Sequence, residues 1–153
     1  MPIFSRYIDS ANILQLQSPM KFRHTLETSA SPEKIWAIWI DVEHWSIWDT
    51  ELQDAYMDEP FELGAIGKLT PKRGRISTFR ISQFNSGNSY TFTLRLPFCS
   101  LNVHRYLVSR AGITYFTHEV SFRGLFAWIF GLLLGRQFKA ALPGVMDNVK
   151  SIA

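Results

Sequence analysis

Two polar side chains that could take part in catalysis or binding occupy positions where the surrounding pattern predicts apolar residues. Apolar and polar residues alternate through 101–109 and 113–122, and Arg105 and His118 fall among the apolar ones. A guanidinium can hold a carboxylate or enolate oxygen, and an imidazole can accept or donate a proton near neutral pH. If the chain is an enzyme, Arg105 and His118 are therefore its candidate catalytic residues.

Other reactive constellations are missing from the sequence. His24, His44, His104 and His118 show no metal-ligand spacing, and Cys99 is the only cysteine. Neither a GxSxG nucleophile motif nor a glycine-rich phosphate loop is present. The sequence therefore predicts no metal and no cofactor.

The elements that must position Arg105 and His118 can be read from periodicity. Residues 20–28 alternate as a half-buried strand, and Ser31, Pro32 and Glu33 have the capping chemistry that opens a helix. Asp41 can cap a second short helix, and apolar residues three or four apart predict a long helix over 124–153. Between these helices the pattern predicts strands at 55–58, 66–70, 75–84, 89–96, 101–109 and 113–122.

Strands joined by short turns must agree on which face is apolar, because a slip of one residue inverts every side chain. A turn at 111–112 pairs His118 with Arg105, and a turn at 85–88 pairs Ile81 with Phe92. A four-residue connection at 97–100 pairs Phe92 with Arg105. All three pairings join apolar faces, which predicts one continuous inner face with Arg105 and His118 as neighbours.

A buried arginine is rare unless it is paired or solvated, so the position of Arg105 leaves three interpretations. An acid from elsewhere neutralises it, or the inner face borders a cavity filled by water or ligand, or Arg105 lies at the sheet margin and extends outward.

A cavity between the sheet and the last helix is the interpretation that yields a ligand site. Twelve Phe and five Trp suit either a bulky core or an aromatic-lined cavity, and Trp45 and Trp48 suit either core anchors or a lid. The predicted ligand-binding residues are Trp45, Trp48, Phe79, Ile81, Tyr90, Phe92, Leu94, Val103, Arg105, Leu107, Phe116, His118, Phe126, Phe130, Leu134 and Phe138.

The last helix is predicted to have two parts. Its first half should form the cavity wall, and 142–152 should clamp the sheet. Pro143 removes a backbone donor and should kink or restart the helix. Gly131 and Gly135 should loosen the first half, since glycine costs about 1 kcal/mol in a helix relative to alanine.

Length and charge set the broad class. The 153 residues suggest one domain over 20–153 with an N-terminal extension, 1–19, that is either a short amphipathic helix or a tail. A net charge of +3 is too small to indicate nucleic-acid binding. The single cysteine and the lack of a signal-like or membrane-spanning run favour the cytoplasm.

Two surface features suggest partners besides a small apolar molecule. Lys68, Lys72, Arg73 and Arg75 surround a predicted turn and suit either a solvated tip or a contact with a membrane surface. The apolar start of the last helix suits a peripheral membrane contact or a homodimer.

The order of elements and two segments resemble a known superfamily. Residues 29–36 (SASPEKIW) and 41–49 (DVEHWSIWD), with 96–98 and 117–125 later on, resemble the SRPBCC superfamily of START-like and Bet v 1-like proteins, and within it the polyketide cyclase/dehydrase-like group. The resemblance implies an α+β helix-grip fold. In that fold a curved antiparallel sheet of six to seven strands wraps a long C-terminal helix, with two short helices after the first strand. It also implies a hydrophobic cavity.

Three functional hypotheses remain at this stage. The first is a non-catalytic binder or carrier of a lipid-, quinone- or polyketide-like ligand. The second is a cyclase, aromatase or dehydratase that uses His118 and Arg105. The third is a module for dimer or membrane contact.

Overall fold

The computed structural model describes residues 20–153. The expectations for the extension, 1–19, lie outside the described residues.

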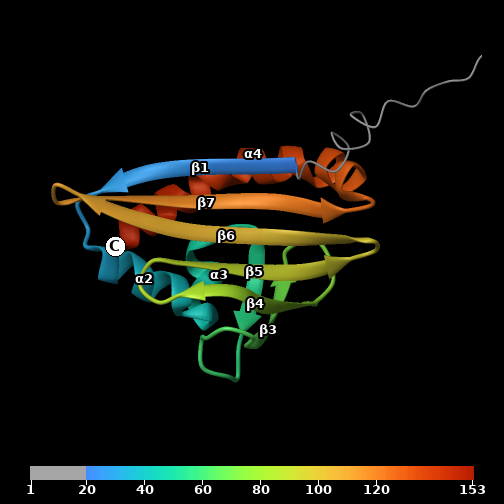
Figure 1. The fold of residues 1–153 in the computed structure, drawn as a ribbon, viewed down its shortest axis with the longest axis horizontal. Helices are drawn as coiled ribbons and strands as arrows, with labels where there is room; N and C mark the ends of the chain where they lie inside the picture. The colour runs from blue at the N-terminus through green and yellow to red at the C-terminus, as the bar shows by residue number, and fades with distance from the viewer. Residues whose placement is uncertain (1–19) are drawn as a thin grey trace, which may run out of the picture.

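Seven strands form one antiparallel sheet, in the order β1-β7-β6-β5-β4-β3-β2. The sheet is curved, and α4 lies across its concave side (Figure 1). This arrangement confirms the predicted helix-grip architecture. The strands are β1 (Met20–Thr28), β2 (Leu52–Tyr56), β3 (Ile66–Pro71), β4 (Ser77–Asn85), β5 (Ser89–Leu96), β6 (Cys99–Arg110) and β7 (Ile113–Gly124).

The helices follow the predicted order. After β1 come α2 (Pro32–Ile40), the short 3-10 helix η1 (Val42–His44) and α3 (Trp45–Trp48). Ser31 caps α2 by accepting a hydrogen bond from the Lys34 N–H over 3.4 Å. The chain ends in α4 (Ala127–Ile152), which packs on β1 and β7.

The register agrees with the prediction in two hairpins and differs in one. His118 pairs with Arg105, and Ile81 pairs with Phe92, as expected. The predicted β5–β6 pairing is wrong by two residues, because the turn consists of Pro97 and Phe98 alone and Arg105 pairs with Tyr90. A shift of two leaves the faces unchanged, so the inner face survives the error.

Two expectations for the last helix concern its proline and its glycines. The helix continues through Pro143, so it does not restart there, and the alternative of a kink stays a prediction. Gly131 and Gly135 are contact points with β1: a methyl group would overlap the Met20 side chain at the first and the Phe22 ring at the second. Small residues at these positions let α4 approach the sheet closely.

The junction between β7 and α4 requires glycine. Gly124 has a φ of 121°, and a β-carbon there would lie 2.7 Å from the Phe98 carbonyl oxygen. That oxygen accepts a hydrogen bond from the Phe126 N–H over 3.3 Å. The β5–β6 turn is therefore fastened to the start of α4.

Candidate functional site

An apolar cavity of about 230 Å³ lies between the concave face of the sheet and α4. Its walls come from the sheet, from the chain around β2 and from the middle of α4. The lining residues are Asp49, Glu51, Leu52, Leu69, Pro71, Arg73, Ser77, Phe92, Leu94, Leu96, Leu101, Val103, Arg105, His118, Val120, Leu134, Gln137, Phe138, Ala141, Leu142 and Val145.

A larger hollow of about 430 Å³ lies on the outer face of β6 and β7. It is lined by Tyr106, Val108, Arg110, Tyr115 and Thr117 and contains no buried charged group. The inner cavity is the better candidate, because buried ionisable groups and a concave apolar wall mark ligand sites.

Arg105 is the most unusual group in the cavity wall. The residue is only 2% exposed, which excludes the interpretation that it extends outward from the sheet margin. Among residues 20–153, no carboxylate oxygen lies within 4.0 Å of its nitrogens. The guanidinium is instead surrounded by aromatic rings, with its Cζ 4.8 Å from the Trp45 ring, 4.7 Å from the Trp48 ring and 5.2 Å from the Phe92 ring. Desolvated contacts of this kind contribute about 2 kcal/mol.

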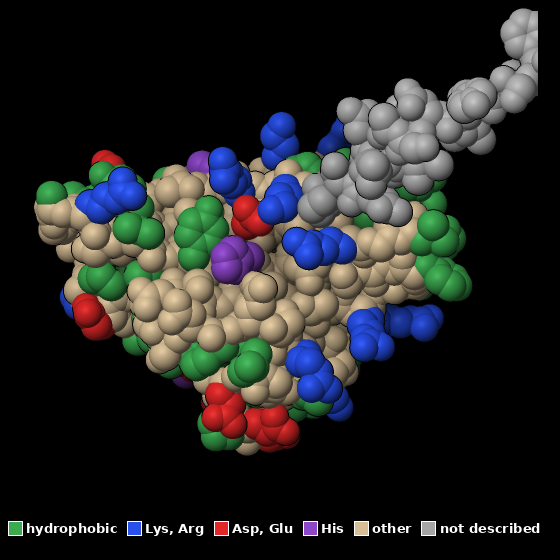
Figure 2. All heavy atoms as spheres, viewed as in Figure 1, with side chains coloured by type: hydrophobic (Ala, Val, Ile, Leu, Met, Phe, Trp, Pro, Cys, Tyr) green, Lys and Arg blue, Asp and Glu red, His purple; other side chains and the backbone are tan. Residues whose placement is uncertain are grey.

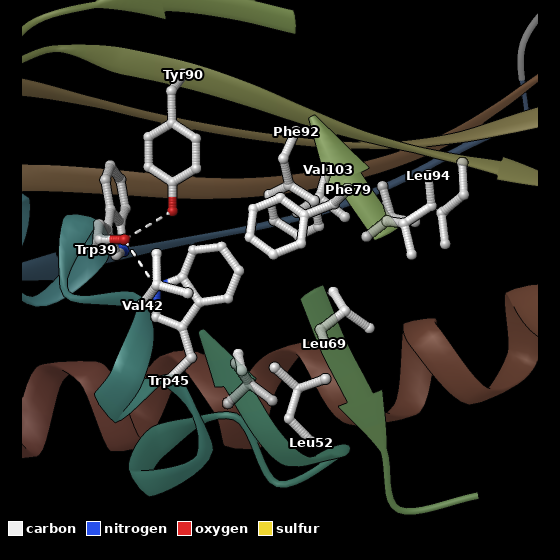
Figure 3. Close-up of a cluster of buried hydrophobic side chains, with 14 of the residues drawn as sticks. Trp39, Val42, Trp45, Leu52, Leu69, Phe79, Tyr90, Phe92, Leu94 and Val103 are labelled. Atoms are coloured by element: carbon white, nitrogen blue, oxygen red, sulfur yellow. Dashed lines mark hydrogen bonds between the residues drawn. The ribbon is translucent and has the colours of Figure 1, made fainter. Parts of the chain in front are cut away.

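A hydrogen-bond network fixes one side of Arg105. Its Nη1 donates to the Tyr90 hydroxyl over 2.6 Å, and this hydroxyl donates to the Trp39 carbonyl oxygen over 3.0 Å. The Trp45 Nε1–H donates to the same carbonyl over 2.9 Å, so both aromatic residues point at one acceptor (Figure 3). The aromatic rings around the charge thus come from α3 and β5, and the Trp39 carbonyl of α2 fixes two of them.

Four buried side-chain nitrogens have no hydrogen-bond partner among the described residues: Trp39 Nε1, Trp48 Nε1, Arg105 Nε and His118 Nε2. Of these four residues, only Arg105 and His118 line the cavity. Buried donors and acceptors are normally satisfied, so such atoms call for an explanation. Burial, with the positive charge of Arg105 and the neighbouring His24, lowers the pKa of His118 well below its usual value. His118 is therefore neutral at physiological pH.

Two acids, Asp49 and Glu51, also line the cavity. The Asp49 carboxylate accepts a hydrogen bond from the Glu51 N–H over 3.1 Å, and Glu51 accepts one from the Gln137 side chain over 2.7 Å. Burial raises the pKa of Asp49, while Arg105 partly opposes the shift. An acid with a raised pKa, a neutral imidazole and a guanidinium thus share one apolar cavity.

The structure divides the predicted ligand-binding residues into two groups. Those that line the cavity are Phe92, Leu94, Val103, Arg105, His118, Leu134 and Phe138. The others pack in or against the core outside the cavity wall: Trp45, Trp48, Phe79, Ile81, Tyr90, Leu107, Phe116, Phe126 and Phe130. Trp45 and Trp48 are core anchors that enclose Arg105.

Asp49 and Glu51 are not among the site residues predicted from the sequence, because neither lies in a predicted strand or helix. Asp49 directly follows the Trp48 of the motif in 41–49, and this adjacency was the available signal. An acid next to an aromatic anchor of the core must lie near that core. Glu51 offers no comparable signal, since its place depends on the Gln137 contact from α4.

Across residues 20–153, no group of three or more His, Cys, Asp or Glu side chains is placed to hold a metal ion. Over the same range, no helix is long and apolar enough to cross a membrane.

A curved antiparallel sheet closed by a C-terminal helix around an apolar cavity defines a helix-grip protein. Residues 19–153 match the family described as polyketide cyclase / dehydrase and lipid transport. The chain belongs to this family, and so to the SRPBCC superfamily that its sequence resembles.

Solved structures support the fold. Norcoclaurine synthase from Thalictrum flavum aligns with a TM-score of 0.66 at 10% identity, over 99% of this chain and 96% of that one. A START superfamily protein from Mycobacterium smegmatis aligns with a TM-score of 0.66 at 14% identity, over 89% and 100%. Ara h 8.0201 gives 0.62 at 13% identity, over 88% and 99%. A comparison with curated proteins gave no match.

Proposed function

We propose that the protein binds a small, largely apolar molecule whose polar oxygen reaches Arg105. The observation that carries this proposal is the buried Arg105 side chain, which lines the cavity while its Nε lacks a hydrogen-bond partner within residues 20–153. A ligand oxygen would accept from this donor and from the cation together.

The energetics favour a ligand over a merely structural role for this charge. An unmatched buried cation costs several kcal/mol, even when aromatic rings recover part of that cost. The other walls near it, among them Phe92, Val103 and Val120, are apolar and would hold the body of the ligand. An apolar pocket with a few convergent polar groups is the usual design of a small-molecule site.

Family membership is consistent with this proposal, because the family description includes lipid transport as well as polyketide cyclase and dehydrase activity. The similar solved structures are under 25% identical and support only the fold.

Calorimetric titration with decanoate tests the proposal, together with mass spectrometry of the organic extract from purified protein. Saturable binding at one site per chain, or a defined apolar molecule in the extract, is expected. An empty extract combined with no heat of binding for decanoate or decanol would refute it.

A second candidate function is proton transfer on a bound carbonyl compound. The observation that favours it is the shared cavity of His118, whose lowered pKa leaves a neutral base, and Asp49, whose raised pKa favours a proton donor. His118 would remove a proton next to the carbonyl, Arg105 would hold the enolate oxygen, and Asp49 would protonate a leaving hydroxyl.

Dehydration of 4-hydroxy-4-phenylbutan-2-one, followed by ultraviolet absorbance, separates the two candidates. An enzyme would accelerate this reaction, and His118→Gln and Asp49→Asn would each lose at least about 100-fold while decanoate affinity stays within about twofold. A wild-type rate equal to that of buffer, with decanoate bound, would leave the binding function alone.

A further inference from the structure

Large apolar side chains are exposed together at one end of the molecule. Phe98 is 72% exposed, Leu125 74%, Trp128 50% and Leu133 70%, and Leu132 beside them is also exposed. Figure 2 shows hydrophobic side chains gathered at the right-hand end, where the β5–β6 turn and the start of α4 lie in Figure 1. We call these five residues the apolar end patch. Contiguous exposed apolar residues of this kind mark interaction sites.

The sheet topology places a basic loop at the same end. The strand pairing brings the end of β5, the start of β6 and the end of β7 together with the β3–β4 connection, 72–76. Lys72, Arg73 and Arg75 lie in that connection, whereas Lys68 lies within β3. The basic residues of the β3–β4 connection and the apolar start of α4, two features noted in the sequence, therefore lie at the same end of the molecule.

Positive charge predominates at this end of the molecule. The segments 71–77, 95–100 and 122–136 contain no Asp or Glu. Of the acids in the neighbouring chain, Asp49 and Glu51 line the cavity, and Asp54 is exposed on β2 opposite Thr70. The basic residues of the three segments are all exposed: Lys72, Arg73, Arg75, Arg95, Arg123 and Arg136.

Phe98 provides a second observation. It lies at the turn with a φ of 52°, a conformation that glycine or asparagine adopts more easily. A bulky aromatic residue in this region is strained. The Phe98 ring contacts the Phe126 ring at 5.3 Å between centroids, but the residue stays mostly exposed to solvent. Strain and exposure in the same residue indicate a role in contact with something outside the chain.

We propose that this end docks on the surface of an anionic lipid bilayer. The apolar end patch would enter the boundary between headgroups and acyl chains, and the six cations would contact lipid phosphates and carboxylates. A symmetric dimer through the same surface would bring those cations face to face, which like-charge repulsion opposes. Docking does not require the proposed ligand.

The cavity rim lies at the docking end. Arg73, Leu96 and Leu134 line the cavity and belong to the same three segments or their borders. A docked molecule would therefore hold its cavity opening close to the lipid. Apolar molecules could then pass between bilayer and cavity with little exposure to water.

Vesicle flotation of the full chain tests the docking. Binding is expected to phosphatidylcholine vesicles containing about a third phosphatidylserine, to weaken between ~0.1 M and ~0.5 M salt, and to be much lower without phosphatidylserine. Trp128 is a built-in probe, because it is half-exposed, whereas Trp39, Trp45 and Trp48 are buried and Trp36 is partly buried on α2. Its emission should shift to the blue with anionic vesicles, and Trp128→Phe should lose that shift.

Two double variants separate the contributions of patch and charge. Leu132→Glu with Leu133→Glu should abolish flotation, and Lys72→Glu with Arg75→Glu should weaken it by at least about 30-fold. The matched control is Lys34→Glu with Arg110→Glu, which removes two exposed cations at the opposite end and should bind within about threefold of wild type. Circular dichroism checks that each variant is folded.

Three results would overturn the proposal. One is the absence of wild-type flotation with anionic vesicles, and another is an equal loss in the control variant. The third is a dimer in mass-resolved chromatography that Leu132→Glu with Leu133→Glu dissociates while no vesicle binding is seen, since the patch would then be an interface between two copies.

Discussion

Arg105 and Tyr90 are directly paired across β6 and β5, and the Arg105 Nη1 donates to the Tyr90 hydroxyl over 2.6 Å. Burial raises the pKa of Tyr90 despite the opposing charge of Arg105, so the hydroxyl keeps its proton and can donate to the Trp39 carbonyl. The phenol thus links the cation of the cavity to the end of α2. This link holds Arg105 in one orientation without neutralising it.

Replacing Tyr90 with phenylalanine should destabilise the protein by about 1–3 kcal/mol, because both the Arg105 donor and the Trp39 acceptor lose a partner. Urea unfolding measures this free energy. Tyr106→Phe, on the outer face of the sheet, is the control and should change the free energy by less than about 0.5 kcal/mol. Equal effects of the two substitutions would contradict the structural role of the Tyr90 hydroxyl.

Arg105→Met should separate ligand selectivity from stability. Methionine fills a similar volume without the desolvation cost, so the free energy of unfolding should stay unchanged or rise. The preference for decanoate over decanol should fall by about 10-fold or more, because a charge-assisted hydrogen bond is lost. Calorimetric titration of both compounds measures this preference. An unchanged ratio of the two dissociation constants would show that the ligand oxygen does not reach Arg105.

The pKa of His118 predicts how stability depends on pH. Because its folded pKa lies well below its unfolded value near 6.5, the unfolded chain takes up the proton first as the pH falls. The free energy of unfolding therefore falls as the pH drops below about 6.5, by at most about 1.4 kcal/mol per pH unit. The fall ends when the pH reaches the pKa of His118 in the folded protein.

His118→Gln should flatten this loss of stability between about pH 6.5 and pH 5, as measured by urea unfolding at each pH. His44→Gln is the control: His44 is exposed, and its Asp41 partner raises its pKa, so its removal cannot flatten the curve. A His118→Gln curve parallel to wild type would mean that His118 is not held neutral in the folded protein.

The glycines of α4 provide a stability test with an internal control. Alanine in a helix is favoured over glycine by about 1 kcal/mol, and Gly144→Ala should gain up to this amount because no atom lies within 4 Å of the added methyl. Gly135→Ala should instead lose about 1–3 kcal/mol, because its methyl overlaps the Phe22 ring. Thermal unfolding of both variants measures the difference. A stabilised Gly135→Ala variant would show that α4 is less close to β1 than described.

Periodicity alone predicted the inner face of the sheet, including the adjacency of Arg105 and His118. That success rests on side-chain alternation, which tolerates the two-residue error at the Pro97–Phe98 turn. The helix-grip fold also followed from element order and from the motifs around Trp36 and Trp48.

Features that depend on tertiary contacts were not predictable in the same way. Asp49 and Glu51 reach the cavity from an irregular connection, whose path is set partly by Gln137 and Asn148 of α4. The role of Gly135 depends on a ring from a strand more than a hundred residues earlier. Helix propensity predicts the free-energy cost of glycine within a helix, but it does not predict the contact with the Phe22 ring.

A cavity-filling substitution tests the central claim, ligand binding between sheet and helix, most directly. Ala141 lines the cavity from α4, whereas its neighbour Ala140 is exposed and does not line it. Decanoate affinity is measured by calorimetry for wild type, Ala141→Trp and Ala140→Trp, with circular dichroism to confirm folding. The proposed site predicts that Ala141→Trp loses at least about 10-fold in affinity while Ala140→Trp stays within about twofold of wild type. Equal affinity in all three proteins would place the bound molecule outside this cavity and contradict the claim.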